Sequence, residues 1–112
     1  MLLMNDSRYP WLILVPRRVA ITEIHHLPAK EQQYLYTEIT KTAEFLEEEF
    51  QLTKINIGAL GNIVPQLHIH IVGRTSSDPA WPNPVWGHSP QVPYQKRESH
   101  KIIKKIITNF TE

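Results

Sequence analysis

The sequence predicts an α+β domain in which an antiparallel sheet is covered by a long helix. Two segments, residues 53–60 and 66–73, alternate apolar and polar side chains, as strands with one buried face do. Between residues 29 and 50 the larger apolar side chains recur at helical spacing, while Glu and Lys fill the other faces. The turn sequence GNIVP separates the two alternating segments, so we expect those strands to pair antiparallel.

Shorter apolar runs predict a hairpin at the start of the chain. LLMN (2–5) and WLILVP (11–16) are strand-like, and the residues between them are typical of a turn. Residues 19–27 favour an irregular connection with a short helical turn. The first run has no lead-in, so either its strand starts at the initiator or an upstream segment is missing. We expect a helix and part of the first strand to lie upstream of Met1 or to be lost.

We expect one domain over residues 1–112, with a core at 2–74, an arm at 75–94 and a C-terminal helix at 95–110. The arm holds five of the nine prolines together with Trp81 and Trp86, so it suits no regular element and should pack against another surface. The C-terminal helix is amphipathic and predicts docking on the core, with a basic patch for a polyanion as the alternative. Its apolar side comprises Ile102, Ile103, Ile106, Ile107 and Phe110.

Composition excludes several classes of protein. A net charge of +1 with 21% charged residues gives no general surface for nucleic acid, so we expect no specific nucleic-acid binding. The absence of cysteine excludes disulfides, thiolate metal sites and cysteine nucleophiles. No apolar stretch reaches the roughly 20 residues that span a bilayer. We therefore expect a cytoplasmic protein that does not bind membranes.

The stretch PQLHIHIVGR (65–74) carries the candidate site. Residues two apart on a strand project to one side, so Gln66, His68 and His70 should share a face. Incidental histidines on a wetted face are the simplest explanation. A metal site would need a third and usually a fourth ligand, and no such spacing is recognisable. Nucleophilic catalysis on phosphorus and a phosphate-binding pocket without chemistry are the other two alternatives.

Histidine suits chemistry at phosphorus. With an ordinary pKa near about 6.5, an imidazole is mostly neutral at pH 7 and is then a good nucleophile. It forms a phosphoramidate that splits one difficult step into two easier ones. A second histidine beside it can donate to phosphate oxygens or to the leaving group.

The motif resembles that of the histidine triad (HIT) family, His-φ-His-φ-His-φ-φ, where φ is apolar. Here the residues are Gln66-Leu67-His68-Ile69-His70-Ile71-Val72, followed by Arg74. LLMN, WLILVPRR before the long helix, Asn56 and the GN turn occur in the family's order, so the resemblance covers about residues 2–86. It implies a HIT-like sheet of about five strands and a homodimer. Glutamine in place of the first histidine is similar to a bacterial dinucleoside tetraphosphate hydrolase-like branch.

The resemblance also implies an activity. HIT proteins are nucleotide hydrolases and transferases that act at the α-phosphate of dinucleoside polyphosphates and nucleoside phosphoramidates. Carried over by position, His68 becomes the nucleophile and His70 the contact to the phosphate and leaving group. No resident cofactor or metal is implied, although Mg²⁺ can accompany a polyphosphate substrate. An altered triad leaves a second possibility, a catalytically weak or inactive nucleotide-binding or interaction protein.

Several positions depart from the family or take roles only by resemblance. Gln66 can orient its neighbours by hydrogen bonding but cannot shuttle a proton. Trp11 stands where the family usually has a histidine and is expected in the core or the pocket wall. Arg74 is expected to pair with a carboxylate. The expected substrate-binding set is Asn5, Asn56, Asn62, Trp11 and Trp81, with Trp81 and Trp86 at the pocket or a dimer contact.

Overall fold

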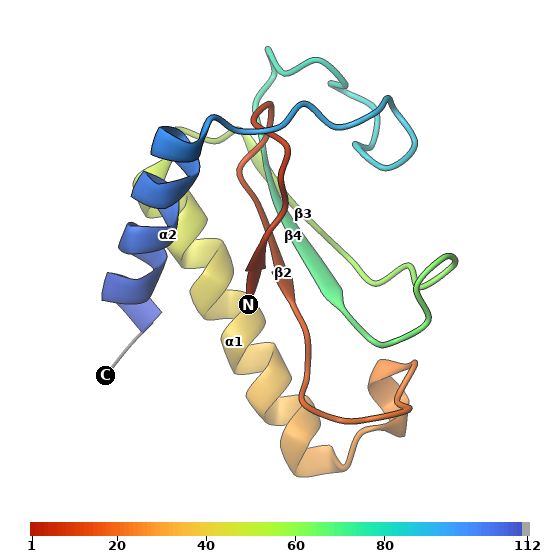
Figure 1. Ribbon diagram of the computed structural model, residues 1–112. Coiled ribbons are helices and arrows are strands. Elements are labelled where there is room, and N and C mark those ends of the chain that lie inside the picture. Colours follow the sequence, from red (N-terminus) through yellow and green to blue (C-terminus); the bar gives the residue numbers. More distant parts are fainter. Residues whose placement is uncertain (111–112) are drawn as a thin grey trace.

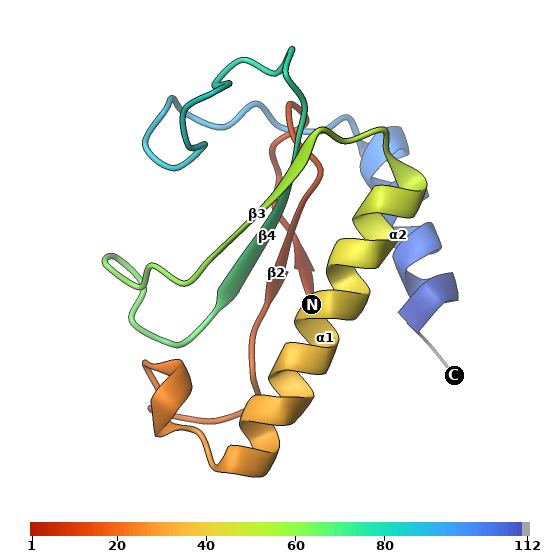
Figure 2. The same cartoon turned by 180° about the vertical axis from the view of Figure 1, so that it is seen from behind.

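The structure is a computed structural model, and it describes residues 1–110. Within this range the chain forms a four-stranded antiparallel sheet of order β1-β2-β4-β3, with α1 packed on one face (Figures 1 and 2). The α+β class is confirmed, with four strands where the resemblance implied about five. The strands are β1 (Leu2–Leu3), β2 (Trp11–Leu14), β3 (Lys54–Gly58) and β4 (Ile69–Arg74).

The helices lie close to their predicted positions. α1 runs over Ala29–Glu49, and a short 3₁₀ turn, Ile24–His26, lies in the connection before it. Pro28 stands immediately before the helix, where its missing N–H costs nothing. α2 covers Lys96–Phe110. No helix within residues 1–110 is long and apolar enough to cross a bilayer.

β4 begins later than the alternation predicts. The predicted strand starts at residue 66, whereas β4 starts at Ile69. The segment before it bonds to the connection between β2 and α1: the backbone N–H of Leu67 donates to the carbonyl of Ile21 (2.8 Å). The side chain of Gln66 donates to the carbonyl of Arg18 (3.0 Å). These contacts replace a strand ladder, so the predicted start of the strand at residue 66 is wrong. Leu67 still packs in the same core as Ile69 and Ile71, so the alternation of faces continues through this segment.

The central strand β4 separates two different environments. All six of its residues are buried, and it pairs with β2 on one side and β3 on the other. Alternation turns Ile69 and Ile71 toward α1, and His70, Val72 and Arg74 toward the opposite face. The core on the α1 side consists of Leu12, Leu14, Leu27, Leu35, Phe45, Leu46, Leu67, Ile69 and Ile71.

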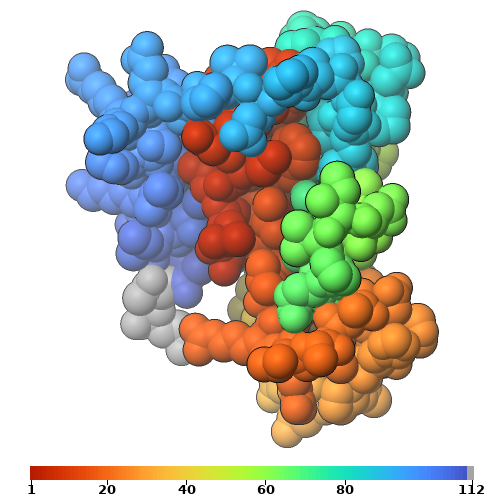
Figure 3. Space-filling view, turned by 45° about the vertical axis from the view of Figure 1, so that its right-hand side comes forward, coloured from red at the N-terminus to blue at the C-terminus, as the bar shows by residue number. Residues whose placement is uncertain are grey.

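The arm covers the second face of the sheet. α1 and the arm lie on opposite sides of the strands (Figure 1), and Ala80 and Val85 join Tyr9, Trp11 and Val72 in a second buried cluster. The chain then crosses back over the N-terminal hairpin, as the blue segment over the red one in Figure 3 shows. There the backbone N–H of Ser7 donates to the carbonyl of Val92 (2.7 Å) and that of Tyr94 donates to Oδ1 of Asn5 (2.9 Å).

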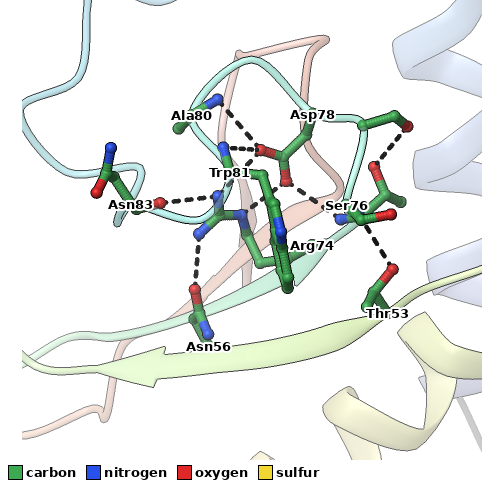
Figure 4. A network of polar contacts seen from close by, with 10 residues as sticks. Thr53, Asn56, Arg74, Ser76, Asp78, Ala80, Trp81 and Asn83 are labelled. Carbon is green, nitrogen blue, oxygen red and sulfur yellow. Dashed lines mark hydrogen bonds and ion pairs between the residues drawn. The ribbon is translucent and has the colours of Figure 1, made fainter.

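A buried ion pair fastens the arm to β4 (Figure 4). The guanidinium of Arg74, 1% exposed, donates from Nε and Nη2 to the two carboxylate oxygens of Asp78, at 2.8 and 3.0 Å. It also donates to Oδ1 of Asn56 and to the carbonyl of Asn83, both at 2.8 Å. The carboxylate in turn accepts backbone N–H groups of Thr75, Ala80 and Trp81. The expected carboxylate partner of Arg74 is therefore confirmed.

α2 docks through only part of its apolar side. Ile106 and Phe110 pack against the core, with the Phe110 and Phe45 rings 5.5 Å apart, and Lys105 pairs with Glu49 at 3.0 Å. Ile103 and Ile107 remain 40% and 56% exposed. The helix therefore docks on the core as predicted, through a stripe narrower than its whole apolar side.

Replacing Asp78 with Asn should destabilise the fold by about 3 kcal/mol or more, because it leaves the buried guanidinium of Arg74 without a countercharge. Glu31→Gln is the matched control, since it breaks the exposed Arg18–Glu31 pair (2.8 Å) and should cost less than about 1 kcal/mol. Urea unfolding monitored by tryptophan fluorescence measures both. Equal losses in the two variants would contradict the structural role of the Arg74–Asp78 pair.

The stabilisation from Asp78 should depend on pH. Burial alone would raise the pKa of this carboxyl, but hydrogen bonds from Arg74, Thr75 and Trp81 outweigh burial and lower the pKa. A lowered folded pKa stabilises the fold above the unfolded value of about 3.9, and this contribution is lost as the pH falls below it. The difference in unfolding free energy between wild type and Asp78→Asn should therefore shrink as the pH falls from about 5 through the lowered folded pKa. A constant difference would show that Asp78 is not ionised in the fold.

Candidate active site

His68 and His70 lie side by side on the face of the sheet away from α1. Their ring centroids are 4.9 Å apart at an interplanar angle of 68°. His70 is buried, at 8% exposure, within β4. His68 is half-buried just before the strand, where it can meet a ligand. The two residues assigned to the chemistry by the motif are therefore adjacent, with His68 the more accessible.

A backbone carbonyl orients His68. Nδ1 of the ring lies 2.7 Å from the carbonyl oxygen of Gln66. A carbonyl oxygen only accepts hydrogen bonds, so Nδ1 must carry the proton and donate it. Neutral imidazole has one N–H, and Nε2 is therefore left with a free lone pair. This is the form of histidine that attacks phosphorus.

Two tryptophans enclose His70. The indole N–H of Trp11 donates to Nδ1 of His70 at 3.0 Å, and the two ring centroids are 5.7 Å apart. The ring of Trp86, from the arm, lies 5.6 Å from His70 on another side. Burial, with the nearby His68 second, lowers the pKa of His70. At neutral pH His70 is thus an uncharged group in an aromatic cage.

Glycine at position 58 makes room for this cage. Gly58 pairs with His70 in the β3–β4 register, so both face the same side of the sheet. A Cβ added at Gly58 would lie 3.2 Å from Cη2 of Trp86, closer than ordinary van der Waals contact. Neither Gly58 nor the contact of Trp86 with His70 was predicted, because both depend on how the arm folds back.

A cleft opens beside His68. It has a volume of about 240 Å³, and Figure 3 shows the green segment around residues 60–68 against the orange connection that precedes α1. The sequence assigned no role to that connection, and no local pattern marks it. It approaches the histidines only through tertiary bonds at Arg18 and Ile21. The lining residues are Thr22, Glu23, Ile24, His25, Ala59, Leu60, Gly61, Gln66, Leu67 and His68.

A larger hollow of about 750 Å³ lies between the end of β2 and α1, with Val15, Leu35 and Thr42 in its lining. Neither His68 nor His70 lines it. The smaller cleft, with the His68 ring in its wall, is therefore the candidate substrate site.

Within residues 1–110, no three His, Asp or Glu side chains gather as a metal site would require.

The expected substrate-binding residues are placed differently from one another. Asn56 shares the face of His70, but its Oδ1 accepts from Arg74. The ring of Trp81 lies 5.6 Å from the Arg74 guanidinium. Asn5 binds the backbone of Tyr94, and Asn62 is exposed in the turn after β3. Of the set, Trp11 alone touches a histidine of the motif, and the substrate contacts of all five residues stay predictions.

Three solved structures are very similar to this one. They are histidine triad proteins from Sinorhizobium meliloti, Bradyrhizobium japonicum and Marinobacter aquaeolei, each with a TM-score of 0.92. Their sequence identities are 45%, 42% and 47%, over 96% of this chain and 80%, 80% and 78% of theirs. This agreement confirms the HIT-like fold implied by the motif.

A curated relative and a family model add to this. A bis(5'-nucleosyl)-tetraphosphatase (asymmetrical) of Schizosaccharomyces pombe is 29% identical over 72 residues, which are 60% of this chain and 39% of that protein. The chain thus aligns with well under half the length of this relative. The model of the HIT domain matches residues 1–77, more than half of the chain. This protein therefore belongs to the histidine triad (HIT) family.

Proposed function

We propose that the protein is a nucleotide hydrolase that acts at the α-phosphate of dinucleoside polyphosphates or nucleoside phosphoramidates. The reaction passes through a nucleotidyl intermediate on His68. One observation carries the proposal: the 2.7 Å contact between Nδ1 of His68 and the Gln66 carbonyl, which leaves Nε2 free to attack. The cleft of about 240 Å³ beside that ring gives the substrate a place to bind.

In the first step the lone pair of His68 Nε2 attacks the α-phosphorus. A P–N bond forms, the bond from phosphorus to the leaving group breaks, and its electron pair departs with the leaving group. The imidazole becomes a cation that still carries its proton on Nδ1. The Gln66 carbonyl accepts from that N–H and stabilises the positive charge.

In the second step water replaces histidine. The water oxygen attacks the α-phosphorus, the P–N bond breaks, and its electron pair returns to Nε2 of His68. The mononucleotide leaves with the new P–O bond, and the proton from water passes to solvent. His70, with its ring 4.9 Å from that of His68, is placed to donate to a phosphate oxygen in both steps.

The glutamine in the motif is compatible with this mechanism. The group that orients His68 is the backbone carbonyl of residue 66, which does not depend on the side chain. The amide of Gln66 points to the carbonyl of Arg18 instead. We propose that the chain belongs to the bacterial dinucleoside tetraphosphate hydrolase-like branch with glutamine first. The name of the Schizosaccharomyces pombe relative supports only the tetraphosphate hydrolase part of this proposal. Mg²⁺ enters only with a polyphosphate substrate.

A second candidate function is nucleotide binding without turnover. It is favoured by one observation, that neither Gln66 nor the caged His70 is a cation at neutral pH. Both candidates share the cleft and the fold. They differ in whether a covalent nucleotide appears on His68.

His68→Ala should abolish hydrolysis of diadenosine tetraphosphate, by about a thousand-fold or more, because no other group can form the intermediate. His100→Ala on α2 is the matched control and should hydrolyse at the wild-type rate. Steady-state release of mononucleotide measures all three proteins. Mass spectrometry of wild type, denatured during turnover at alkaline pH, should show one nucleotidyl group on His68.

Each other outcome has a definite meaning. Turnover that survives in His68→Ala would contradict the assigned nucleophile. Tight nucleotide binding by a wild type that neither turns over nor forms the adduct would establish the binding protein. If no nucleotide binds, membership of the family predicts the fold of this protein but not its activity.

A further inference from the structure

We propose that Trp11 is a positioning residue that fixes the tautomer of His70, and that the site consequently favours leaving groups that depart as anions. The inference rests on the proposed function and specifies its substrate class: dinucleoside polyphosphates over nucleoside phosphoramidates.

The hydrogen bond from Trp11 determines where His70 carries its proton. An indole N–H is a donor only, so the ring nitrogen that receives it must hold a lone pair. That nitrogen is Nδ1 of His70, at 3.0 Å. The single proton of the neutral imidazole is therefore on Nε2. Protonating Nδ1 as well would set two N–H groups against each other.

The surrounding aromatic rings keep the His70 imidazole from rotating away from the Trp11 indole N–H. Trp11 is 5% exposed, and its ring packs edge-on against Tyr9 and Trp86, each 6.3 Å away between centroids. Trp86 closes another side of His70, and its own indole N–H is buried without a partner. The imidazole cannot rotate without displacing one of two large aromatic rings.

The charges around His70 also oppose an imidazolium. Its backbone partners, Ile13 on β2 and Gly58 on β3, carry no charge. The titratable group against its ring is His68, which can only become a cation. Further along the same face of β4, the guanidinium of Arg74 is already matched by Asp78. The lowered pKa of His70 agrees with this arrangement.

Other proton donors at the cleft are few. The amide of Gln66 does not titrate and is turned toward Arg18. Glu23 and His25 also line the cleft, and of these two residue types histidine is the usual proton donor near neutral pH. His25 is the remaining side chain of the cleft that could donate a proton, so the second test below includes the variant His25→Gln.

The two substrate classes differ in whether the leaving group needs a proton. In a phosphoanhydride the breaking bond is P–O, and its electron pair stays on a terminal phosphate oxygen that is a stable anion. In a phosphoramidate the breaking bond is P–N, and nitrogen must be protonated before it can leave. His70 donates a hydrogen bond from Nε2 but, held neutral, is a poor acid. General acid catalysis is typically worth about a hundred-fold to ten-thousand-fold, and this site forgoes it.

The first test is the tautomer itself, read by ¹⁵N–¹H NMR of the histidine side chains. In wild type at neutral pH, His70 should show a non-protonated Nδ1 and a protonated Nε2. Trp11→Phe keeps an aromatic ring and should give mixed tautomers and a higher His70 pKa. Trp86→Phe is the matched control, because it removes an indole N–H that His70 does not use, and the tautomer should be unchanged.

The second test compares kcat/KM for diadenosine tetraphosphate and adenosine 5'-phosphoramidate. Wild type should prefer the anhydride by about a hundred-fold or more, and Trp11→Phe should reduce that preference at least tenfold while shifting the pH profile. Comparable rates in wild type would overturn the selectivity. If His25→Gln then removed only the phosphoramidate activity, His25 would be the general acid that protonates the leaving nitrogen, and the proposal would be wrong.

The two tests separate the possible failures. A wild-type His70 protonated on Nδ1, or a tautomer unaffected by Trp11→Phe, overturns the role of Trp11 whatever the kinetics show. No turnover of either substrate overturns the proposed function and the selectivity together. The wild-type spectrum needs no variant, so a His70 protonated on Nδ1 would overturn the role of Trp11 even if Trp11→Phe does not fold.

Discussion

The buried ion pair between Arg74 and Asp78 determines the form of the second face of the sheet. A guanidinium at 1% exposure is strongly unfavourable unless a carboxylate and other acceptors surround it. Asp78 supplies the carboxylate only if the chain turns back immediately after β4 (Figure 4). That turn directs the arm across the second face of the sheet. Farther along the arm, the ring of Trp86 packs against His70. The aromatic cage of the site thus depends on an ion pair that never touches the histidines.

Strand alternation explains why one strand serves both stability and chemistry. β4 is buried on both faces, which normally gives a continuous apolar run. Here Ile69 and Ile71 meet α1, while His70 and Arg74 meet the arm. Each of these two polar residues has a specific partner, an indole N–H for His70 and a carboxylate for Arg74. The partners make burial of the polar residues tolerable, and they also fix the protonation of each.

How much the sequence could predict depends on the range of the interaction. α1, the pairing of β3 with β4, the adjacency of His68 and His70, and a carboxylate partner for Arg74 all follow from local periodicity or simple chemistry. The late start of β4 does not, because residues 66–68 bond to a distant connection rather than to a strand. The packing of Trp86 against Gly58 and the cleft wall at Thr22–His25 depend likewise on tertiary contacts that no local pattern encodes.

In the proposed mechanism, the two departures from the family motif act on different parts of the reaction. At position 66 the backbone carbonyl accepts from Nδ1 of His68, so exchanging histidine for glutamine would leave the proposed attack by His68 intact. At position 11 the side chain itself matters, because the group it presents to Nδ1 decides whether His70 can carry a second proton. In this proposal, a donor-only indole would remove acid character from His70 but would leave its Nε2–H free to donate to a phosphate. On the proposed mechanism, attack by His68 would be preserved while protonation of the leaving group would be weakened. The chemistry of the leaving group, more than that of the nucleotide, should then distinguish the substrates of this protein.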